Sequence, residues 1–154
     1  MEKKFELTDN FVINAFGIKL FQIKCTKSFK YANEGDLGGY VEKEDNLSQS
    51  GDAWVSGNAW VSGNARVSGN AQVYGKARVE NNHMHCGFDC FGSCNRHTHA
   101  YKTKGNKVEI TCGCFRGSLE EFEKKVEETH KGTIYEKQYK AIINLIKIKF
   151  GIDG

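Results

Sequence analysis

The sequence predicts a mainly β chain built around a short solenoid, with an α+β part at its C-terminal end. A valine recurs at every sixth position, at Val55, Val61, Val67, Val73 and Val79. Each of the first four valines is followed four places later by an alanine, at Ala59, Ala65, Ala71 and Ala77. Helix signals begin only after residue 117. Self-similarity at a short fixed period indicates a solenoid, an architecture that carries binding surfaces rather than a default chemistry.

The repeat resembles the hexapeptide motif of left-handed parallel β-helices, in which a small residue follows an aliphatic one by four places. In such a helix three hexads make one triangular coil, so equivalent residues of successive coils stack at about 4.8 Å. The resemblance implies that Val55 lies against Val73 and Val61 against Val79. Glycines such as Gly57 tolerate positive φ at the corners. We therefore expect a short left-handed parallel β-helix.

The β-helix is expected to occupy residues 41–82 and to be capped by residues 1–40. Residues 18–25 form a β-type run after a turn at 14–17, and a solenoid needs its open end covered. Val41 and Leu47 keep the six-residue phase with Ala53, so residues 41–52 are interpreted as degenerate hexads. The total is roughly 2.3 coils, a small core that needs help from oligomerisation. Its resemblance to hexapeptide proteins implies a homotrimer.

Residues 83–154 are expected to form a Cys/His-rich segment and a small ββαα domain. The runs 100–103 and 107–112 flank a Lys104-Gly105-Asn106 turn, which is typical of a β-hairpin. Ser118 and Glu121 make a capping box, so a helix is expected to start there and to end at Lys131 and Gly132. A second amphipathic helix is predicted from the spacing of Tyr135, Tyr139, Ile142, Ile143, Ile146 and Phe150.

Two further segments carry a resemblance to a family. Residues 113–122, GCFRGSLEEF, together with Thr129-His130, resemble the C-terminal domain of bacteriophage and prophage hexapeptide-repeat proteins. Residues 34–44, EGDLGGYVEKE, resemble the beginning of their β-helix. Those proteins tend to carry Gly-Ser-Arg-Asn-Asp before the hairpin, where this chain has Cys94 in place of the arginine and Arg96 in place of the acid. The resemblance implies a phage or prophage accessory protein.

Outward positions of the repeat predict an interface. Trp54 and Trp60 are expected in exposed slots, with Trp60 beside Arg78 in a cation–π pair worth about 0.5–1 kcal/mol. Exposed tryptophans with arginines are typical of interfaces. Contact within a trimer, cover by the C-terminal domain and a ligand platform remain open alternatives. The candidate ligand- or partner-binding residues are Trp54, Trp60, Arg66, Arg78 and Arg116.

A Cys/His-rich stretch between residues 83 and 99 is the candidate metal site. Thiolate and imidazole are the ligands that zinc prefers, and Cys86, Cys90, Cys94 and His97 could close a structural Zn²⁺ site, with His99 as an alternative to His97. The spacing is not a standard CxxC pair. The competing interpretation is a set of inert thiols beside a surface histidine tract.

The sequence assigns no catalytic residue. Cys112 and Cys114 precede a helix start, where thiol pKa values can fall, but a helix over residues 118–130 spans about 18 Å and separates Cys114 from His130. Arg116 and the amides after Ser118 could hold an anion, although Glu120 and Glu121 already favour plain capping. The lysine stripe of the last helix is too sparse for a nucleic-acid site.

Composition limits the remaining classes. The net charge is +3, no run reaches the ~18 apolar residues of a membrane helix, and the N-terminus has no apolar signal region. We expect a cytoplasmic protein of a bacterial host. The predicted function is a non-enzymatic oligomeric scaffold that either binds and inhibits a host defence component or sequesters a nucleotide signal. The alternatives are a virion component and a hexapeptide-type acyltransferase, against which residues 1–82 contain no histidine.

Overall fold

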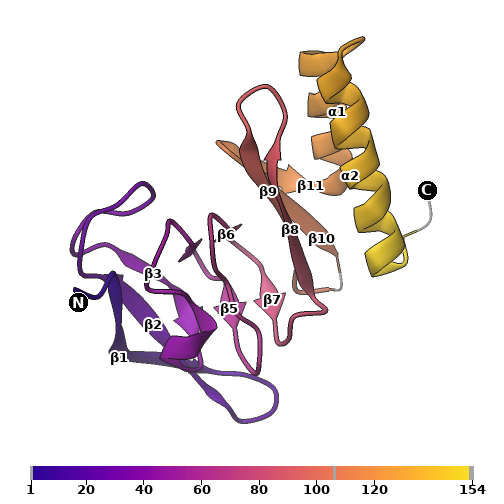
Figure 1. The fold of residues 1–154 in the computed structure, drawn as a ribbon. Helices are drawn as coiled ribbons and strands as arrows, with labels where there is room; N and C mark the ends of the chain where they lie inside the picture. Colours follow the sequence, from indigo (N-terminus) through magenta and orange to yellow (C-terminus); the bar gives the residue numbers. More distant parts are fainter. Residues whose placement is uncertain (1, 106, 153–154) are drawn as a thin grey trace.

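The chain folds into three β-sheets followed by two helices (Figure 1). The computed structural model describes residues 2–105 and 107–152. The strands are β1 (Phe5–Ile13), β2 (Lys19–Cys25), β3 (Leu37–Val41), β4 (Trp54–Val55), β5 (Trp60–Val61), β6 (Gln72–Val73), β7 (Arg78–Val79), β8 (His85–Phe91), β9 (Arg96–Lys102), β10 (Val108–Cys112) and β11 (Phe115–Ser118). The helices are α1 (Leu119–His130) and α2 (Ile134–Phe150), and a 3-10 turn covers Glu44–Asn46.

The repeat forms parallel two-residue strands with the predicted spacing. Val55 of β4 pairs with Val73 of β6, and Val61 of β5 pairs with Val79 of β7, in each case 18 positions later. All five repeat valines have no exposed surface, and the alanines that follow them are buried in the same core. Gly57, Gly63, Gly69 and Gly75 turn the corners with φ between 60° and 67°. The periodicity of the sequence therefore predicts the local register correctly.

The predicted fold class, a left-handed parallel β-helix, is nevertheless wrong. The largest sheet has the order β1-β2-β3-β5-β7 and is mixed, because β1, β2 and β3 pair antiparallel. A second sheet of four strands is antiparallel throughout, and only the β4–β6 pair forms a purely parallel sheet. The physical reason lies in strand length. The repeat strands are two residues long, whereas the β1–β2 hairpin and the β8–β9 pair contribute strands of seven to nine residues.

The expected phase of residues 41–52 is also wrong. Val41 pairs with Val61 and Leu47 with Val67, so these pairs are 20 positions apart rather than 18. The 3-10 turn Glu44–Asn46 lies between Val41 and Leu47, which keep the six-residue spacing of their partners Val61 and Val67. The two extra residues therefore lie between Leu47 and Val55, which are eight positions apart. Buried Asn46 donates from Nδ2 to the carbonyl oxygen of Ala65 at 2.8 Å, which fixes this turn against the next coil.

The second sheet has the order β11-β10-β9-β8, with helices on one face and the repeat on the other (Figure 1). Successive side chains of a strand point to opposite faces. Ala100 of β9 accordingly belongs to the core shared with the helices, and its neighbour Tyr101 belongs to the core of the repeat. The predicted hairpin is the β9–β10 pair, but the domain has four strands rather than the two of a ββαα unit. Asn106 of its turn lies outside the described residues.

Both helices begin as the sequence predicts. The Ser118 hydroxyl accepts from the Glu121 amide at 3.1 Å, and the Glu121 carboxylate accepts from the Ser118 amide at 3.0 Å. This capping box satisfies donors that a helix start would leave unpaired. The apolar stripe Leu119, Phe122 and Val126 of α1 packs with Tyr139, Ile142, Ile143 and Ile146 of α2. Within the described residues, neither helix is long and apolar enough to cross a membrane.

Trp54 is not exposed, contrary to the prediction. Only 4% of its surface is accessible, and its ring packs edge-on against Phe29 at 5.2 Å between ring centroids. The N-terminal segment therefore covers this indole, rather than the C-terminal domain or a partner. Trp60 is half-buried, and the predicted cation–π pair is confirmed because the Arg78 guanidinium lies 3.9 Å from its ring centroid. Because Trp54 is buried within the chain, it gives no support to the predicted interface.

The repeat corners supply a matched test of the fold. Gly63 and Gly69 have φ of 60° and 63°, so replacement by alanine costs each about 1–2 kcal/mol of backbone strain. A Cβ at residue 63 would also overlap the Glu80 carbonyl oxygen, whereas a Cβ at residue 69 would meet nothing within 4 Å. Gly63→Ala should therefore lower the free energy of unfolding by about 1–3 kcal/mol more than Gly69→Ala, measured by urea denaturation. Equal losses would contradict the close packing of this coil.

Candidate functional site

A basic pocket lies between the helix-covered face of the four-stranded sheet and α1. Its volume is about 540 Å³. Three side chains that carry or can carry positive charge face it, namely Arg96, Lys125 and His130. Arg116 also lines the cavity, but its guanidinium lies over Tyr74 of the repeat. Three others supply rings, namely Phe115, Phe122 and Tyr139, and none of its lining residues is a carboxylate. We refer to this cavity as the basic pocket.

Two structural features place the cations. Arg96 opens β9, and its guanidinium lies against Gly113, where an added Cβ would meet Nη1 at 2.5 Å and Cζ at 3.0 Å. Gly113 also has φ of 60°, so this position favours glycine both for its backbone conformation and for the space it leaves to Arg96. Lys125 and Thr129 are four residues apart on α1, as are Val126 and His130, so these two adjacent rows of the helix face the pocket together. The pocket thus receives cations from both the sheet and the helix.

Aromatic rings form the floor of the basic pocket. Phe122 packs against Phe115 at 5.3 Å and meets Tyr139 edge-on at 5.6 Å between centroids. The His130 imidazole stacks on Tyr139 at 5.4 Å with an interplanar angle of 29°. Burial, followed by the nearby Cys112 thiol, raises the pKa of the Tyr139 hydroxyl, which therefore stays protonated and can donate. The pocket combines ring faces with cations and a neutral hydroxyl.

The start of α1 does not provide the anion site that the sequence left open. The Ser118 amide is already paired with the Glu121 carboxylate at 3.0 Å, so plain capping describes this helix end. That hydrogen bond lowers the pKa of Glu121 and keeps a negative charge at the helix start. Lys125 and His130 instead lie along the side of α1, and Arg96 reaches the basic pocket from β9. An anionic ligand would approach the flank of the helix and not its first turn.

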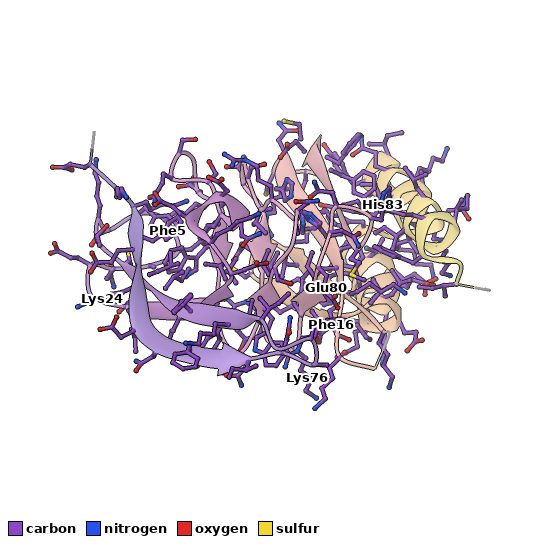
Figure 2. All side chains as sticks on the ribbon, turned by 90° about the horizontal axis from the view of Figure 1, so that it is seen from below. Phe5, Phe16, Lys24, Lys76, Glu80 and His83 are labelled. Carbon is purple, nitrogen blue, oxygen red and sulfur yellow. The ribbon has the colours of Figure 1, made fainter. Side chains whose placement is uncertain are left out.

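The predicted binding residues do not gather at one place. Arg116 lines the basic pocket, while its guanidinium stacks on Tyr74 at 4.1 Å. Trp60 and Arg78 line another cavity of about 220 Å³, together with Phe16 and Glu80, which are labelled in Figure 2. Arg66 donates from Nη1 to the Asp45 carbonyl oxygen at 3.2 Å. Of the predicted set, Arg116 alone lines the basic pocket, and strand alternation places its side chain with Thr111 on the repeat-facing side of the sheet.

The predicted zinc ligands Cys86, Cys90, Cys94 and His97 do not come together. Cys86 pairs with Ala100 across the sheet and packs with the helix-side core, whereas strand alternation places His97 on the opposite face with His99. Cys90 is exposed in the bulge between Phe88 and Phe91, and Cys94 is exposed in the turn that follows β8. Within residues 2–105 and 107–152, no group of three or more His, Cys, Asp or Glu side chains is placed to hold a metal ion. The zinc-site prediction is corrected accordingly.

The histidines instead form a chain of hydrogen bonds, which we call the imidazole chain. His97 Nδ1 lies 2.6 Å from Asp89 Oδ1, and His97 Nε2 lies 2.9 Å from His99 Nδ1. His99 Nε2 lies 2.9 Å from His85 Nδ1, and His85 Nε2 lies 3.0 Å from Asn82 Oδ1. Burial lowers the pKa of His85 to about 4, with a smaller contribution from Lys149, and burial also holds the pKa of His99 well below its ordinary value.

The sequence singles out the histidines only as candidate metal ligands, and it does not predict the basic pocket. Arg96 stands out in the sequence only as a departure from a family pattern, and nothing marks Lys125 and Thr129 except their spacing of four, which places them on one helix face. His97 and His99 are two apart in a strand, which places them on one face of a sheet. Only the β8–β9 pairing, a non-local contact, brings His85 to them.

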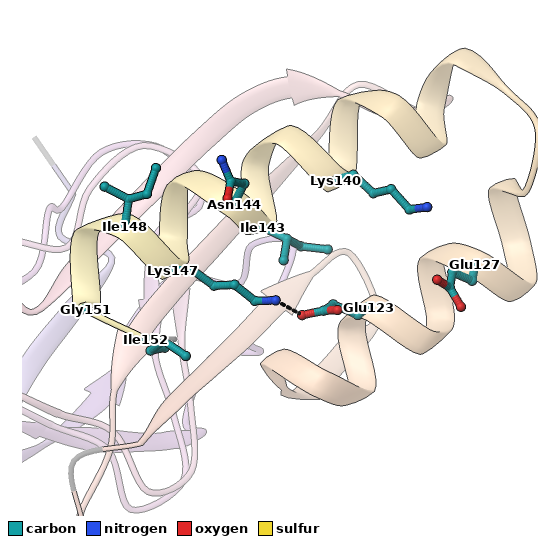
Figure 3. Close-up of a pocket in the computed structure, with 9 residues that line it drawn as sticks. All are labelled: Glu123, Glu127, Lys140, Ile143, Asn144, Lys147, Ile148, Gly151 and Ile152. Carbon is teal, nitrogen blue, oxygen red and sulfur yellow. Dashed lines mark ion pairs between the residues drawn. The ribbon is translucent and has the colours of Figure 1, made fainter. Parts of the chain in front are cut away.

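A second cavity, the interhelical groove, lies between α1 and α2 and has a volume of about 480 Å³ (Figure 3). Its lining includes two carboxylates and two amines, from Glu123, Glu127, Lys140 and Lys147. Lys147 Nζ forms an ion pair with Glu123 Oε1 at 2.8 Å, drawn as a dashed line in Figure 3. Because its charges are balanced, this groove has less preference for the sign of a ligand than the basic pocket.

Comparison with known proteins gives no information about the function of this chain. A scan against protein-family models finds no match, and a search of curated proteins finds none either. The properties of the basic pocket that bear on function are its charge, its ring faces and its volume.

The pKa of His85 leads to a prediction for stability in acid. An unfolded histidine titrates near pH 6.5, whereas burial lowers the pKa of folded His85 to about 4. As the pH falls through this window, the unfolded state binds a proton that the folded state rejects, so the free energy of unfolding decreases. His85→Gln should make this decrease shallower, measured by urea denaturation between about pH 7 and pH 4. The exposed His83 serves as the control position, and a wild-type slope in His85→Gln would contradict the prediction.

Proposed function

We propose that this chain is a non-enzymatic binding protein that holds a nucleotide, a ligand with phosphate and a planar base, in the basic pocket. The observation that carries the proposal is a lining of three basic side chains, Arg96, Lys125 and His130, and three rings without a carboxylate. Arginine forks bind phosphate oxygens in pairs, and aromatic rings stack on bases without needing a particular sequence. Arg96 and Lys125 are suited to the phosphate, and the rings of His130 and Phe115 to the base.

Pocket size agrees with one nucleotide. Small-molecule sites are typically clefts of about 300–1,000 Å³, lined mostly by apolar and aromatic groups with a few polar anchors. The basic pocket, at about 540 Å³, falls within this range. Thr129 and the Tyr139 hydroxyl offer neutral polar contacts beside the cations. A ligand of this size would bury its base against the rings and leave its phosphate near the rim.

Binding accounts for the pocket better than catalysis does. Cys114 and His130 both line the pocket, although the length of α1 predicted that they would be separated. No hydrogen bond joins their side chains in the described part of the chain, and the His130 ring contacts Tyr135 and Tyr139 instead. The Cys112 thiol receives a hydrogen bond from Thr98 Oγ1 at 3.2 Å and is buried. Neither thiol has the paired base that an activated nucleophile requires.

A protein partner is the second candidate function, and the β1–β2 hairpin favours it. Phe11, Ile13 and Phe16 expose 45%, 56% and 75% of their surface, and grouped exposed apolar side chains are typical of interaction sites. A host protein or the further copies of a homotrimer would cover such a patch. Light scattering tests the homotrimer. A monomer at about micromolar concentration would rule out self-association through this hairpin at that concentration.

Adjacent lysines of α1 provide a matched test of the nucleotide site. Lys125 and Lys124 are both exposed, but only Lys125 lines the basic pocket. A charge-assisted hydrogen bond to phosphate contributes about 1.5–3 kcal/mol, so Lys125→Ala should weaken nucleotide binding by about tenfold or more. Lys124→Ala should leave the affinity unchanged. The measurement is isothermal titration calorimetry with ATP and with a cyclic dinucleotide at fixed salt.

Arg96→Ala extends the same test to the sheet side of the pocket, where a larger loss is expected because a guanidinium can hold phosphate with two hydrogen bonds. Inorganic phosphate alone should bind more weakly than either nucleotide, since it cannot use the rings. Failure of the wild-type chain to bind either nucleotide at about millimolar concentration would overturn the proposal, as would equal losses in Lys124→Ala and Lys125→Ala.

A further inference from the structure

We propose that the imidazole chain holds one excess proton at its Asp89 end, and that loss of this proton loosens the turn between β8 and β9. This inference concerns a pH-sensitive device on the repeat-facing side of the sheet, and it goes beyond the proposed nucleotide binding. It rests on hydrogen-bond geometry, namely a run of four contacts that ends in an oxygen acceptor on each side.

The direction of the chain is fixed at Asn82. Asn82 Oδ1 accepts from the backbone amide of Arg66 at 3.0 Å, and Asn82 Nδ2 donates to the Asn64 carbonyl oxygen at 3.3 Å. Turning the amide over would break both contacts, because an amide nitrogen cannot accept and an amide oxygen cannot donate. Asn82 therefore presents an acceptor to His85. It follows that His85 Nε2, 3.0 Å away, must carry a hydrogen.

The hydrogen on His85 Nε2 determines which nitrogen donates in each of the three imidazoles. A neutral imidazole has one donor and one acceptor nitrogen. If His85 donates to Asn82, its Nδ1 accepts from His99 Nε2, and His99 Nδ1 then accepts from His97 Nε2. His97 would be left with an acceptor at Nδ1, facing the acceptor Asp89 Oδ1 at only 2.6 Å. Three neutral rings supply three protons for four contacts, so the fourth contact requires one proton more.

The surroundings place the resulting positive charge at His97. Burial lowers the pKa values of His85 and His99, and the amine of Lys149 on α2 adds to the effect at His85. Burial also raises the pKa of the Cys86 thiol, which therefore contributes no charge from β8. Asp89 is the carboxylate that meets the chain, and Arg66 meets it only through its backbone amide and Asn82. An ion pair of His97 with Asp89 is thus the stable arrangement.

Gly87 makes room for the two stacked rings. The His97 and His99 rings lie 5.1 Å apart with an interplanar angle of 24°. A Cβ on Gly87 would approach His97 Nε2 at 2.6 Å and His99 Nδ1 at 2.7 Å, the two atoms that form the central hydrogen bond. Gly87 is not among the glycines with positive φ, so alanine suits its backbone. Gly87→Ala can therefore disturb the chain without changing any titratable group.

Loss of the excess proton would act on the β8–β9 turn. Asp89 directly precedes Cys90, which has φ of 68° within the bulge between Phe88 and Phe91. The turn then reaches Gly92, whose amide donates to Gln138 Oε1 at 2.9 Å and whose Cα faces the Tyr139 hydroxyl. Without the proton, two acceptors at 2.6 Å repel each other, and the contact that holds Asp89 to β9 must open.

The test counts ring protons directly. Long-range ¹H–¹⁵N NMR of histidine-labelled protein distinguishes imidazolium from neutral tautomers, followed here from about pH 5 to pH 9. For the wild-type chain we expect His97 as an imidazolium at neutral pH, with His85 and His99 as neutral tautomers protonated at Nε2. In Asp89→Asn the side-chain amide can donate to His97 Nδ1, so His97 no longer needs a second proton. The number of ring N–H protons on His85, His97 and His99 together should then fall from four to three. Gly87→Ala should break the His97–His99 pairing while His83 remains as an internal reference.

Hydrogen exchange provides the second readout. Amides of residues 90–95 should exchange faster in wild type than in Asp89→Asn once the pH exceeds the midpoint at which His97 loses its proton, and equally below it. Three neutral rings in the wild type at neutral pH would overturn the proposal, as would an unchanged proton count in Asp89→Asn. If Asp89→Asn did not fold, the wild-type count alone would decide. Nucleotide binding is not needed for either measurement, so failure here is distinct from failure of the proposed function.

Discussion

Both faces of the β8–β11 sheet are buried, and the arrangement of the whole molecule depends on this constraint. Ala100 and Tyr101 are neighbours in β9, yet they belong to the helix-side core and the repeat core respectively. Thr111 Oγ1 donates to the Gln72 carbonyl oxygen at 2.8 Å, and Gln72 Nε2 donates to the Gly113 carbonyl oxygen at 3.3 Å. The sheet thereby covers the open side of the repeat, which is too small to bury its own core, and at the same time carries the helices.

The two buried faces have different chemistry because they bury different residue types. On the repeat side the sheet brings in polar groups, and a buried polar group needs a partner. His99, with 4% of its surface exposed, meets this requirement through both ring nitrogens. On the helix side the packing is apolar until the sheet reaches the β10–β11 turn, where Gly113 leaves space for Arg96. The basic pocket therefore forms where helix packing ends.

The sequence predicts local features well and non-local pairing poorly. The 18-residue register, the Ser118 capping box and the β9–β10 hairpin depend on residues whose spacing is visible along the chain. The antiparallel pairing of β2 with β3 and the 20-residue offset at Val41 depend on how the N-terminal hairpin and the segment between Leu47 and Val55 meet the repeat. Likewise, Arg96 and Lys125 meet at the basic pocket from a strand and a helix, and no spacing along the chain reveals that contact.

A net charge of +3 is too small to select a ligand, but the placement of the charges is not uniform. Three of the six glutamates of the helices have partners elsewhere: Glu121 caps α1, Glu123 pairs with Lys147, and Glu136 pairs with Lys140 at 3.5 Å. No ion pair of the described residues involves the arginines of the basic pocket or Lys125. Cations gathered in a cleft without counter-charges focus a positive potential. An anion entering the basic pocket would supply the missing partner, and the rings beneath it would favour one attached to a planar base.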